Sequence, residues 1–204
     1  MRTIILAAAA ALSTAGAPAQ AGEVFGGLFA HDVTFIGETI GVGAAGVEDG
    51  VDLHLGYRTE KIEALRLIGR PAVYGFVAIN SENTSNYGGV GLGWTVPLGS
   101  RLYVQPGVGL VYTDGEDELP DFSEPGITPA EAQRRAALRA ERIEFGSKVL
   151  FEPELAIGYR FTSRFAAELA YVHISNGRII GGSEQNDGMD TVGVRLLYRL
   201  GGAP

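Results

Sequence analysis

Along most of this chain apolar residues alternate with small or polar ones, and this period of two constrains the fold more than any other feature. Side chains on a β-strand point alternately to opposite faces, so each alternating run predicts a strand with one apolar face. The longest clear example, residues 102–112, is apolar at every even position: Leu102, Val104, Pro106, Val108, Leu110 and Tyr112. The chain is therefore predicted to be all-β.

Four further runs follow the same rule, at residues 51–57, 87–96, 149–161 and 192–200, and weaker alternation occurs at 24–33, 72–80 and 165–175. Together these runs give eight strands, and a tilted strand of about 9–11 residues is long enough to cross a bilayer. After residue 21 no apolar stretch reaches the ~18 residues that indicate a membrane helix. The predicted architecture is an eight-stranded antiparallel β-barrel.

The two faces of these strands differ in a way that indicates which one lines the barrel. Glycine accounts for 30 of the 204 residues, about twice the usual share, and the glycine-rich face also carries most of the charges. An eight-stranded barrel has room inside only for side chains, so we expect six charged residues to pair in the lumen: Glu152, Glu154, Glu168, Arg160, Arg195 and Arg199. The apolar face then contacts lipid, as in a transmembrane barrel of the outer-membrane type. A soluble, lipocalin-like barrel is the alternative.

Charge and cysteine content exclude several other classes. The chain has 16 Lys and Arg against 24 Asp and Glu, a formal net charge of −8, which argues against a nucleic-acid partner. It contains no cysteine, which rules out disulfides, thiolate metal sites and a cysteine nucleophile. Residues 1–21 are typical of a secretory signal peptide, with Arg2, an apolar run from Ile4 to Leu12, and small residues up to Ala21. We expect residues 22–204 to form one exported domain in the outer membrane.

The predicted connections differ in length between the two ends of the barrel. With the N-terminus on the periplasmic side, residues 59–70, 97–101 and 162–164 are periplasmic, and the external loops are longer. The longest external loop, residues 114–146, contains a predicted short helix that starts after Thr128, with Pro129 first and Glu131 as capping-box glutamate. The arginines of this helix either form a solvated face or meet anionic lipid head groups.

Three residues with the chemistry of a hydrolase triad fall on one face at the external end of the last two strands. His173 and Ser175 are two residues apart on the seventh strand, close enough for an imidazole nitrogen to reach a hydroxyl. Asp190 has the parity of the outward-facing residues on the eighth strand and is placed to orient the imidazole. The alternative is that His173 is an interfacial polar residue and that Ser175 only opens a turn.

The run His173-Ile174-Ser175-Asn176, followed by the acidic segment 186–190, resembles the lipid A 3-O-deacylase family of outer-membrane barrels, which carries a His-x-Ser-Asn motif. The resemblance implies that Ser175 is the nucleophile and His173 the general base. It also implies that Asn176 and the backbone N–H of Gly177 help to stabilise the oxyanion.

The acid is less firmly assigned than the other two residues. The resemblance makes Asp190 the orienting acid, yet this chain has Asp where the family has Glu. The spacing of 15 residues from Ser175 is also a few residues longer than expected. Glu184 and Asp187 therefore stay open as rivals for this role.

The resemblance implies hydrolysis of the 3-position acyl ester of lipid A through an acyl-enzyme, a reaction that needs no metal or organic cofactor. An outward-facing triad at the external end of a barrel would meet lipid A, the membrane anchor of lipopolysaccharide, in the outer leaflet. The expected partner is this lipid, with a second copy of the chain in a homodimer as an open alternative. Two other functions stay open: a non-catalytic structural barrel, and an outer-membrane phospholipase that uses the same triad.

Overall fold

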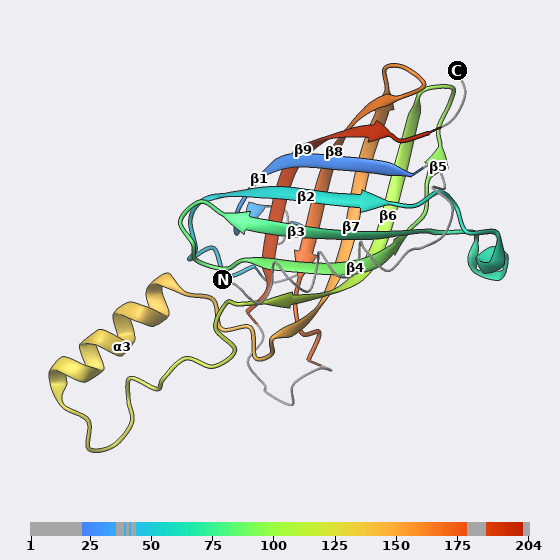
Figure 1. Cartoon of the computed structure of the whole chain (residues 1–204). Coiled ribbons are helices and arrows are strands. Elements are labelled where there is room, and N and C mark those ends of the chain that lie inside the picture. Colours follow the sequence, from blue (N-terminus) through green and yellow to red (C-terminus); the bar gives the residue numbers. More distant parts are fainter. Residues whose placement is uncertain (1–21, 36–38, 40, 42–43, 179–186, 202–204) are drawn as a thin grey trace.

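The computed structural model describes residues 22–35, 39, 41, 44–178 and 187–201. The predicted signal peptide, residues 1–21, and the rival acid Glu184 lie outside the described residues. The described chain forms a closed barrel of antiparallel strands with long connections at one end, as Figure 1 shows.

The barrel wall is built from β1 (Glu23–Ala30), β2 (Val51–Arg58), β3 (Ala72–Asn80), β4 (Tyr87–Gly93), β5 (Val96–Pro97), β6 (Leu102–Thr113), β7 (Val149–Arg160), β8 (Phe165–Ile174) and β9 (Met189–Arg199). Apart from β4 and β5, consecutive strands are hydrogen-bonded neighbours, and β1 also pairs with β9. The pairing of β4 with β6 closes the sheet on itself. No strand edge is left open in this wall, which a lipid environment requires.

β4 and β5 are two parts of a single wall strand. Both pair with β6 in one register, with Gly93 opposite Gly107 and Val96 opposite Val104. Between them the Trp94 N–H donates to the Pro106 carbonyl at 2.9 Å, and Pro106 has no N–H to return a bond. The prediction of eight strands is therefore confirmed, and a proline in the neighbouring strand explains the interruption.

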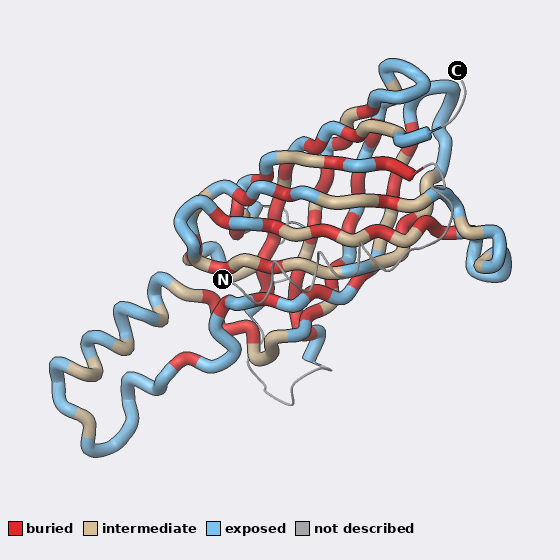
Figure 2. The backbone as a smooth tube through the Cα atoms, in the orientation of Figure 1, coloured by how far each residue is buried: buried red, intermediate tan, exposed pale blue. Residues whose placement is uncertain are grey.

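Burial alternates along the strands as predicted, and Figure 2 shows the pattern along the wall. On β7, Leu155 and Ile157 are each 52% exposed, whereas Glu152 and Ala156 are fully buried. Large apolar side chains thus cover the outside of the barrel, and its interior holds the charged side chains together with a buried apolar cluster that includes Phe29 and Phe76. The transmembrane arrangement is confirmed, because a soluble barrel would place these two groups the other way round.

Ion pairs lie in the lumen, but some of the charged residues have other partners than those predicted. Arg195 binds Glu154 at 2.6 and 2.8 Å and Glu168 at 2.6 Å. Glu168 also accepts from Arg58 at 3.0 Å, a residue that the predicted set did not include. The prediction that Glu152 pairs with an arginine is wrong, because this carboxylate accepts a hydrogen bond from the Tyr74 hydroxyl instead.

Arg160 and Arg199 also differ from the prediction. Both donate to Glu23 at the start of β1, at 3.1 and 3.4 Å, and to none of the three carboxylates named from the sequence. Parity places a residue on the inner face but does not say at which height or on which side of the lumen its partner stands. The partners were therefore mispredicted while the face was predicted correctly.

The two ends of the barrel carry connections of different length. Residues 31–50, 81–86, 114–148 and 175–188 join strands at one end, and residues 59–71, 98–101 and 161–164 join them at the other. Outer-membrane barrels have long external loops and short periplasmic turns, so the first end faces outward. At the second end the longest connection holds a 3-10 helix, η1 (Glu63–Ile68). Among the described residues no helix is long and apolar enough to span a membrane.

The predicted loop helix is α3 (Pro129–Glu141), which projects beyond the barrel end in Figure 1. Thr128 caps it, because its hydroxyl accepts the Glu131 N–H at 3.2 Å. The Glu131 carboxylate binds two arginines of the same helix, Arg134 and Arg135, at 2.8 Å. These arginines are therefore engaged within their own loop, which favours the solvated face over binding to lipid head groups.

Candidate active site

The last two strands bring His173 and Asp190 together. β8 and β9 are antiparallel, and their register places His173 directly opposite Asp190. Opposite residues project from the same face of the sheet. That face is the outer one, because Leu169 and Val194, which share its parity, are more than half exposed. The Nδ1 atom of His173 lies 2.6 Å from Oδ1 of Asp190, a length typical of a hydrogen bond to a charged acceptor.

The hydrogen bond to Asp190 settles which ring nitrogen of His173 is available for chemistry. An ionised carboxylate only accepts hydrogen bonds, so Nδ1 carries the proton and donates it. This assignment leaves Nε2 as the ring nitrogen that is not bonded to Asp190. This is the tautomer that a general base for a hydroxyl nucleophile needs.

Asp190 and Ser175 are more sheltered than the sequence suggests. Both have outward parity, but Asp190 is fully buried and Ser175 is 8% exposed, while the His173 side chain is 13% exposed. The loop after β1 lies against this end of β9, since the Val33 N–H donates to the Asp190 carbonyl at 2.9 Å. The expectation of side chains open to lipid is therefore corrected for these positions. A sheltered site strengthens charge interactions, because the local dielectric is low.

Ser175 continues β8 by one residue. Its N–H donates to the Phe151 carbonyl at 3.1 Å, and the Phe151 N–H returns a bond to its carbonyl at 2.7 Å. Extending the register of β7 and β8 puts Pro153, which has no N–H, opposite His173, so the ladder is interrupted just before Ser175. The pairing with Phe151 thus fixes the backbone of Ser175, and the side chain of Ser175 has the same parity as that of His173.

Ser175 and His173 are two residues apart on one strand, but their side chains are not hydrogen-bonded to each other in the described chain. No hydrogen bond joins Ser175 Oγ to His173 within the described chain, although residues i and i+2 of a strand lie roughly 6.5–7 Å apart at Cα. Catalytic hydrogen bonds are often long or poorly aligned until substrate is bound. The absence of this bond in the structure therefore does not rule out Ser175 and His173 as a candidate nucleophile and base.

Asn176 and Gly177 form a turn that is fixed by the long external loop. The side-chain NH2 of Asn176 donates to the Phe145 carbonyl at 2.9 Å, and the side-chain oxygen of Asn176 accepts the Arg178 N–H at 2.7 Å. Gly177 has a φ of +61°, a left-handed conformation that glycine adopts easily. The Asn176 side chain is fully buried, so its contacts set the direction of the backbone after Ser175. Sequence reasoning missed the contribution of Phe145, because loop contacts carry no periodic signal.

Of the two rival acids, only Asp187 lies among the described residues. Its N–H donates to the Glu144 carbonyl at 3.1 Å, in the long external loop. Burial and the charge of Glu144 raise the pKa of Asp187 above its usual range. Among the described acids it is Asp190, not Asp187, that is hydrogen-bonded to His173.

A second histidine–carboxylate cluster lies on the lumen side of the same barrel end and was not predicted. His31 Nδ1 is 2.8 Å from Asp52, and His31 Nε2 is 3.2 Å from Glu48. Burial opposes protonation of His31, but the hydrogen bonds to both carboxylates outweigh it and raise its pKa to about 9. Glu48 also accepts the Ile143 N–H at 3.2 Å. The cluster therefore ties the loop after β1 to the long external loop.

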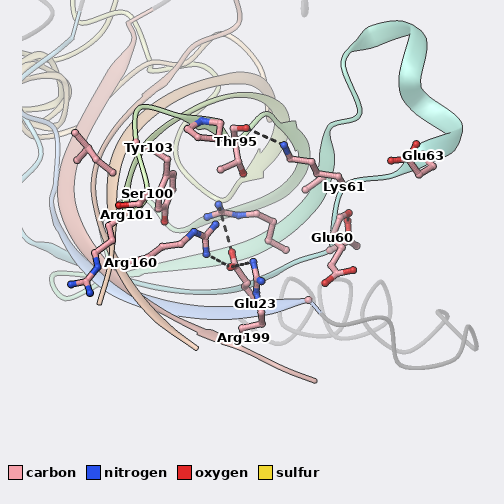
Figure 3. Close-up of a pocket in the computed structure, with 17 residues that line it drawn as sticks. Glu23, Glu60, Lys61, Glu63, Thr95, Ser100, Arg101, Tyr103, Arg160 and Arg199 are labelled. Atoms are coloured by element: carbon pink, nitrogen blue, oxygen red, sulfur yellow. Dashed lines mark hydrogen bonds and ion pairs between the residues drawn. The ribbon is translucent and has the colours of Figure 1, made fainter. Parts of the chain in front are cut away.

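The barrel also has a cavity of about 600 Å³, at the opposite end from His173 (Figure 3). Arg160 and Arg199 point toward Glu23 in it, and Arg160 lies 4.7 Å from the centre of the Tyr103 ring. This cavity is part of the charged lumen and does not include the candidate triad. An outward-facing site is reached from the bilayer, so a lipid substrate needs no such cavity.

The closed antiparallel barrel with an apolar outer face is that of an outer-membrane β-barrel protein. The sequence model of one family, lipid A 3-O-deacylase (PagL), matches residues 73–199, from β3 to the end of β9. This match covers more than half of the chain. The chain belongs to the lipid A 3-O-deacylase (PagL) family and is an ester hydrolase of the outer membrane.

One solved structure supports this fold, and two others are less similar. The crystal structure of the outer-membrane enzyme PagL matches with a TM-score of 0.52 and 12% identity, over 87% of this chain and 99% of that one. A de novo designed transmembrane β-barrel matches at 0.48 and 11% identity, over 90% and 98% of the two chains. The Yersinia pestis outer-membrane protein Ail matches at 0.41 and 12%, over 88% and 99%. The last two scores are too low to support an inference, and no curated protein sequence matches the chain significantly.

Proposed function

We propose that this protein hydrolyses the acyl ester at the 3-position of lipid A, with Ser175 as nucleophile, His173 as general base and Asp190 as orienting acid. The observation that carries the proposal is the 2.6 Å hydrogen bond between His173 and Asp190 on the outer face of the barrel, at its long-loop end. Membership of the family supplies the substrate class. The position of Ser175 two residues from His173 supplies the nucleophile.

The first half of the reaction forms an acyl-enzyme. Ser175 Oγ attacks the ester carbonyl carbon as its proton passes to His173 Nε2, and the carbonyl oxygen takes up the negative charge. The imidazolium that forms is stabilised by Asp190 at Nδ1. When the tetrahedral intermediate collapses, the bond to the sugar oxygen breaks and His173 returns the proton to that oxygen. The first product is lipid A with a free 3-hydroxyl group.

The second half of the reaction regenerates the enzyme. A water molecule gives a proton to His173 Nε2 and its oxygen attacks the acyl carbon. The bond to Ser175 Oγ then breaks, and the proton returns to that oxygen. The second product is a free fatty acid, so one water is consumed for each ester cleaved.

The negative charge on the carbonyl oxygen needs donors close to Ser175. The backbone N–H of Gly177 is the main candidate, because the left-handed φ of this residue turns the backbone sharply just after the nucleophile. Asn176 takes part through its buried amide, which is engaged with Phe145 and so fixes the turn that aims this N–H. Loss of one oxyanion donor typically costs about 10²–10³ in kcat.

Purified protein incubated in detergent with lipid A, and separately with a glycerophospholipid, tests the proposal. Mass spectrometry should show lipid A losing one 3-hydroxyacyl chain, while the phospholipid keeps both of its acyl chains. Release of fatty acid from the phospholipid alone would show a phospholipase. No release from either lipid would favour a non-catalytic barrel.

A further inference from the structure

A tyrosine outside the triad shares the acid with His173. The Tyr171 hydroxyl donates to Asp190 Oδ1 at 3.0 Å. This is the same oxygen that accepts the hydrogen bond from His173 Nδ1 at 2.6 Å. The other oxygen of Asp190, Oδ2, is buried and has no hydrogen-bond partner among the described residues. The carboxylate is therefore held through one oxygen by two donors.

The register of the strands produces this arrangement. Tyr171 precedes His173 by two residues on β8, so both side chains project from the outer face. Tyr171 is opposite Val192 of β9, which makes Asp190 its diagonal neighbour. Diagonal neighbours in a sheet are about 7–8 Å apart at the backbone, within reach of an aromatic side chain. The tyrosine hydroxyl thus arrives at Asp190 from the side away from Ser175.

The contact matters because Asp190 is fully buried on the lipid side of the wall. A buried carboxylate is costly unless donors satisfy it, and hydrogen bonds to the ionised form favour that form. With Oδ2 unpartnered, Tyr171 and His173 are the donors that the described side chains supply to it. Without Tyr171 the carboxylate would be held by His173 alone and would rotate more freely.

We propose that Tyr171 is a positioning residue of the active site, which keeps Asp190 aimed at His173. The inference rests on the proposed function, since it assigns Tyr171 a part in the same reaction. Tyr171 touches no reacting atom and acts through Asp190 alone. The competing view is that Tyr171 is only an aromatic anchor at the membrane interface.

The substitution Tyr171→Phe tests this proposal. Tyr112→Phe is the matched control, because it removes an outward-facing hydroxyl from β6 at the same end of the barrel. Tyr171→Phe should lower kcat for lipid A deacylation roughly tenfold, as expected for one hydrogen bond to a charged group, with KM unchanged. Tyr112→Phe should match the wild type in both respects.

A double-mutant cycle with Asp190→Asn separates positioning from stability. If Tyr171 acts through Asp190, adding Tyr171→Phe to Asp190→Asn should cause less than a twofold further loss. A further tenfold loss in the double variant would overturn the inference. A wild-type protein that does not deacylate lipid A would overturn both this inference and the proposed function. A normal Tyr171→Phe beside an impaired Asp190→Asn would overturn this inference alone.

Discussion

Replacing Asp190 by asparagine removes one charge at the point where the proposed mechanism needs it. Asp190 accepts from His173 at 2.6 Å and from Tyr171 at 3.0 Å. An asparagine oxygen can still accept one or both hydrogen bonds, but it cannot stabilise the imidazolium that forms during catalysis. Its amide can also donate to Nδ1, which would move the ring proton to Nε2 and block the base. The corresponding change in a serine protease triad lowers kcat by about 10⁴, so we expect a loss of about 10³–10⁴ here.

The same substitution should leave the barrel folded. A hydrogen bond to a charged group is worth about 1.5–3 kcal/mol and a neutral one about 0.5–1.5 kcal/mol, so two weakened bonds cost about 2–3 kcal/mol. The variant no longer buries a charge in a fully covered position, which offsets part of this loss. Heat-modifiable migration in detergent gels should therefore stay as in the wild type.

Asp187→Asn is the matched control, because it removes the same charge three residues earlier in a residue that contacts Glu144. Deacylation of lipid A, followed by mass spectrometry over time, should continue at the wild-type rate in this variant. Glu184→Gln extends the control to the other rival acid. If Asp190→Asn keeps a rate within threefold of the wild type while either control loses activity, the assignment of Asp190 is wrong.

Three further predictions concern the barrel. Val108→Arg puts a charge on the lipid face at the middle of β6, which should cost about 2–4 kcal/mol and lower the folded fraction in liposomes. The control Gly99→Arg, in an open periplasmic turn, should leave the folded fraction unchanged. Equal folding of both variants would contradict the assigned faces. Gly193→Ala should also lower the folded fraction on gels, because its Cβ would overlap the Phe29 ring where β9 meets β1; normal folding would show that this seam can adjust. Because hydrogen bonds outweigh burial and raise the pKa of His31 to about 9, the stability that its protonated form contributes is complete below about pH 6.5 and lost as pH rises through 9. The melting temperature should fall across that window in the wild type but not in His31→Gln, and a parallel fall in both would remove His31 as the cause.

Parity predicted the faces of the strands because it is a local property of the backbone. The outward direction of His173 and Asp190 followed from counting residues along two neighbouring strands, and the register confirms that they are opposite each other. Their adjacency needed only the rule that consecutive strands of such a barrel pair. This part of the candidate site could be predicted from the sequence.

Contacts across the lumen could not be predicted in the same way. Arg58 and Glu168 are 110 residues apart and meet inside the barrel. Their meeting depends on the stagger and tilt of all the strands between them. Alternation carries no information on that stagger, so it cannot favour Arg58 over Arg160 as the partner of Glu168.

The burial of Asp190 could not be predicted from the sequence either. It depends partly on the loop after β1, where Val33 lies against β9, and on Tyr171, which the alternation presents as one more outward aromatic. Loops lack a period, and a hydrogen bond between side chains on neighbouring strands depends on their rotamers. The face and the end of the site were therefore predictable, while its burial and its second donor were not.

Ser175→Ala gives the most direct test of the proposed function. The substitution removes one hydroxyl and leaves both backbone hydrogen bonds between Ser175 and Phe151 intact, so the barrel should fold and migrate as the wild type does. Each purified protein is incubated with lipid A in detergent, and the products are weighed by mass spectrometry. We predict that the wild type removes one 3-hydroxyacyl chain and that Ser175→Ala removes none, a loss of several orders of magnitude. Deacylation by Ser175→Ala at the wild-type rate would contradict the mechanism proposed for this protein.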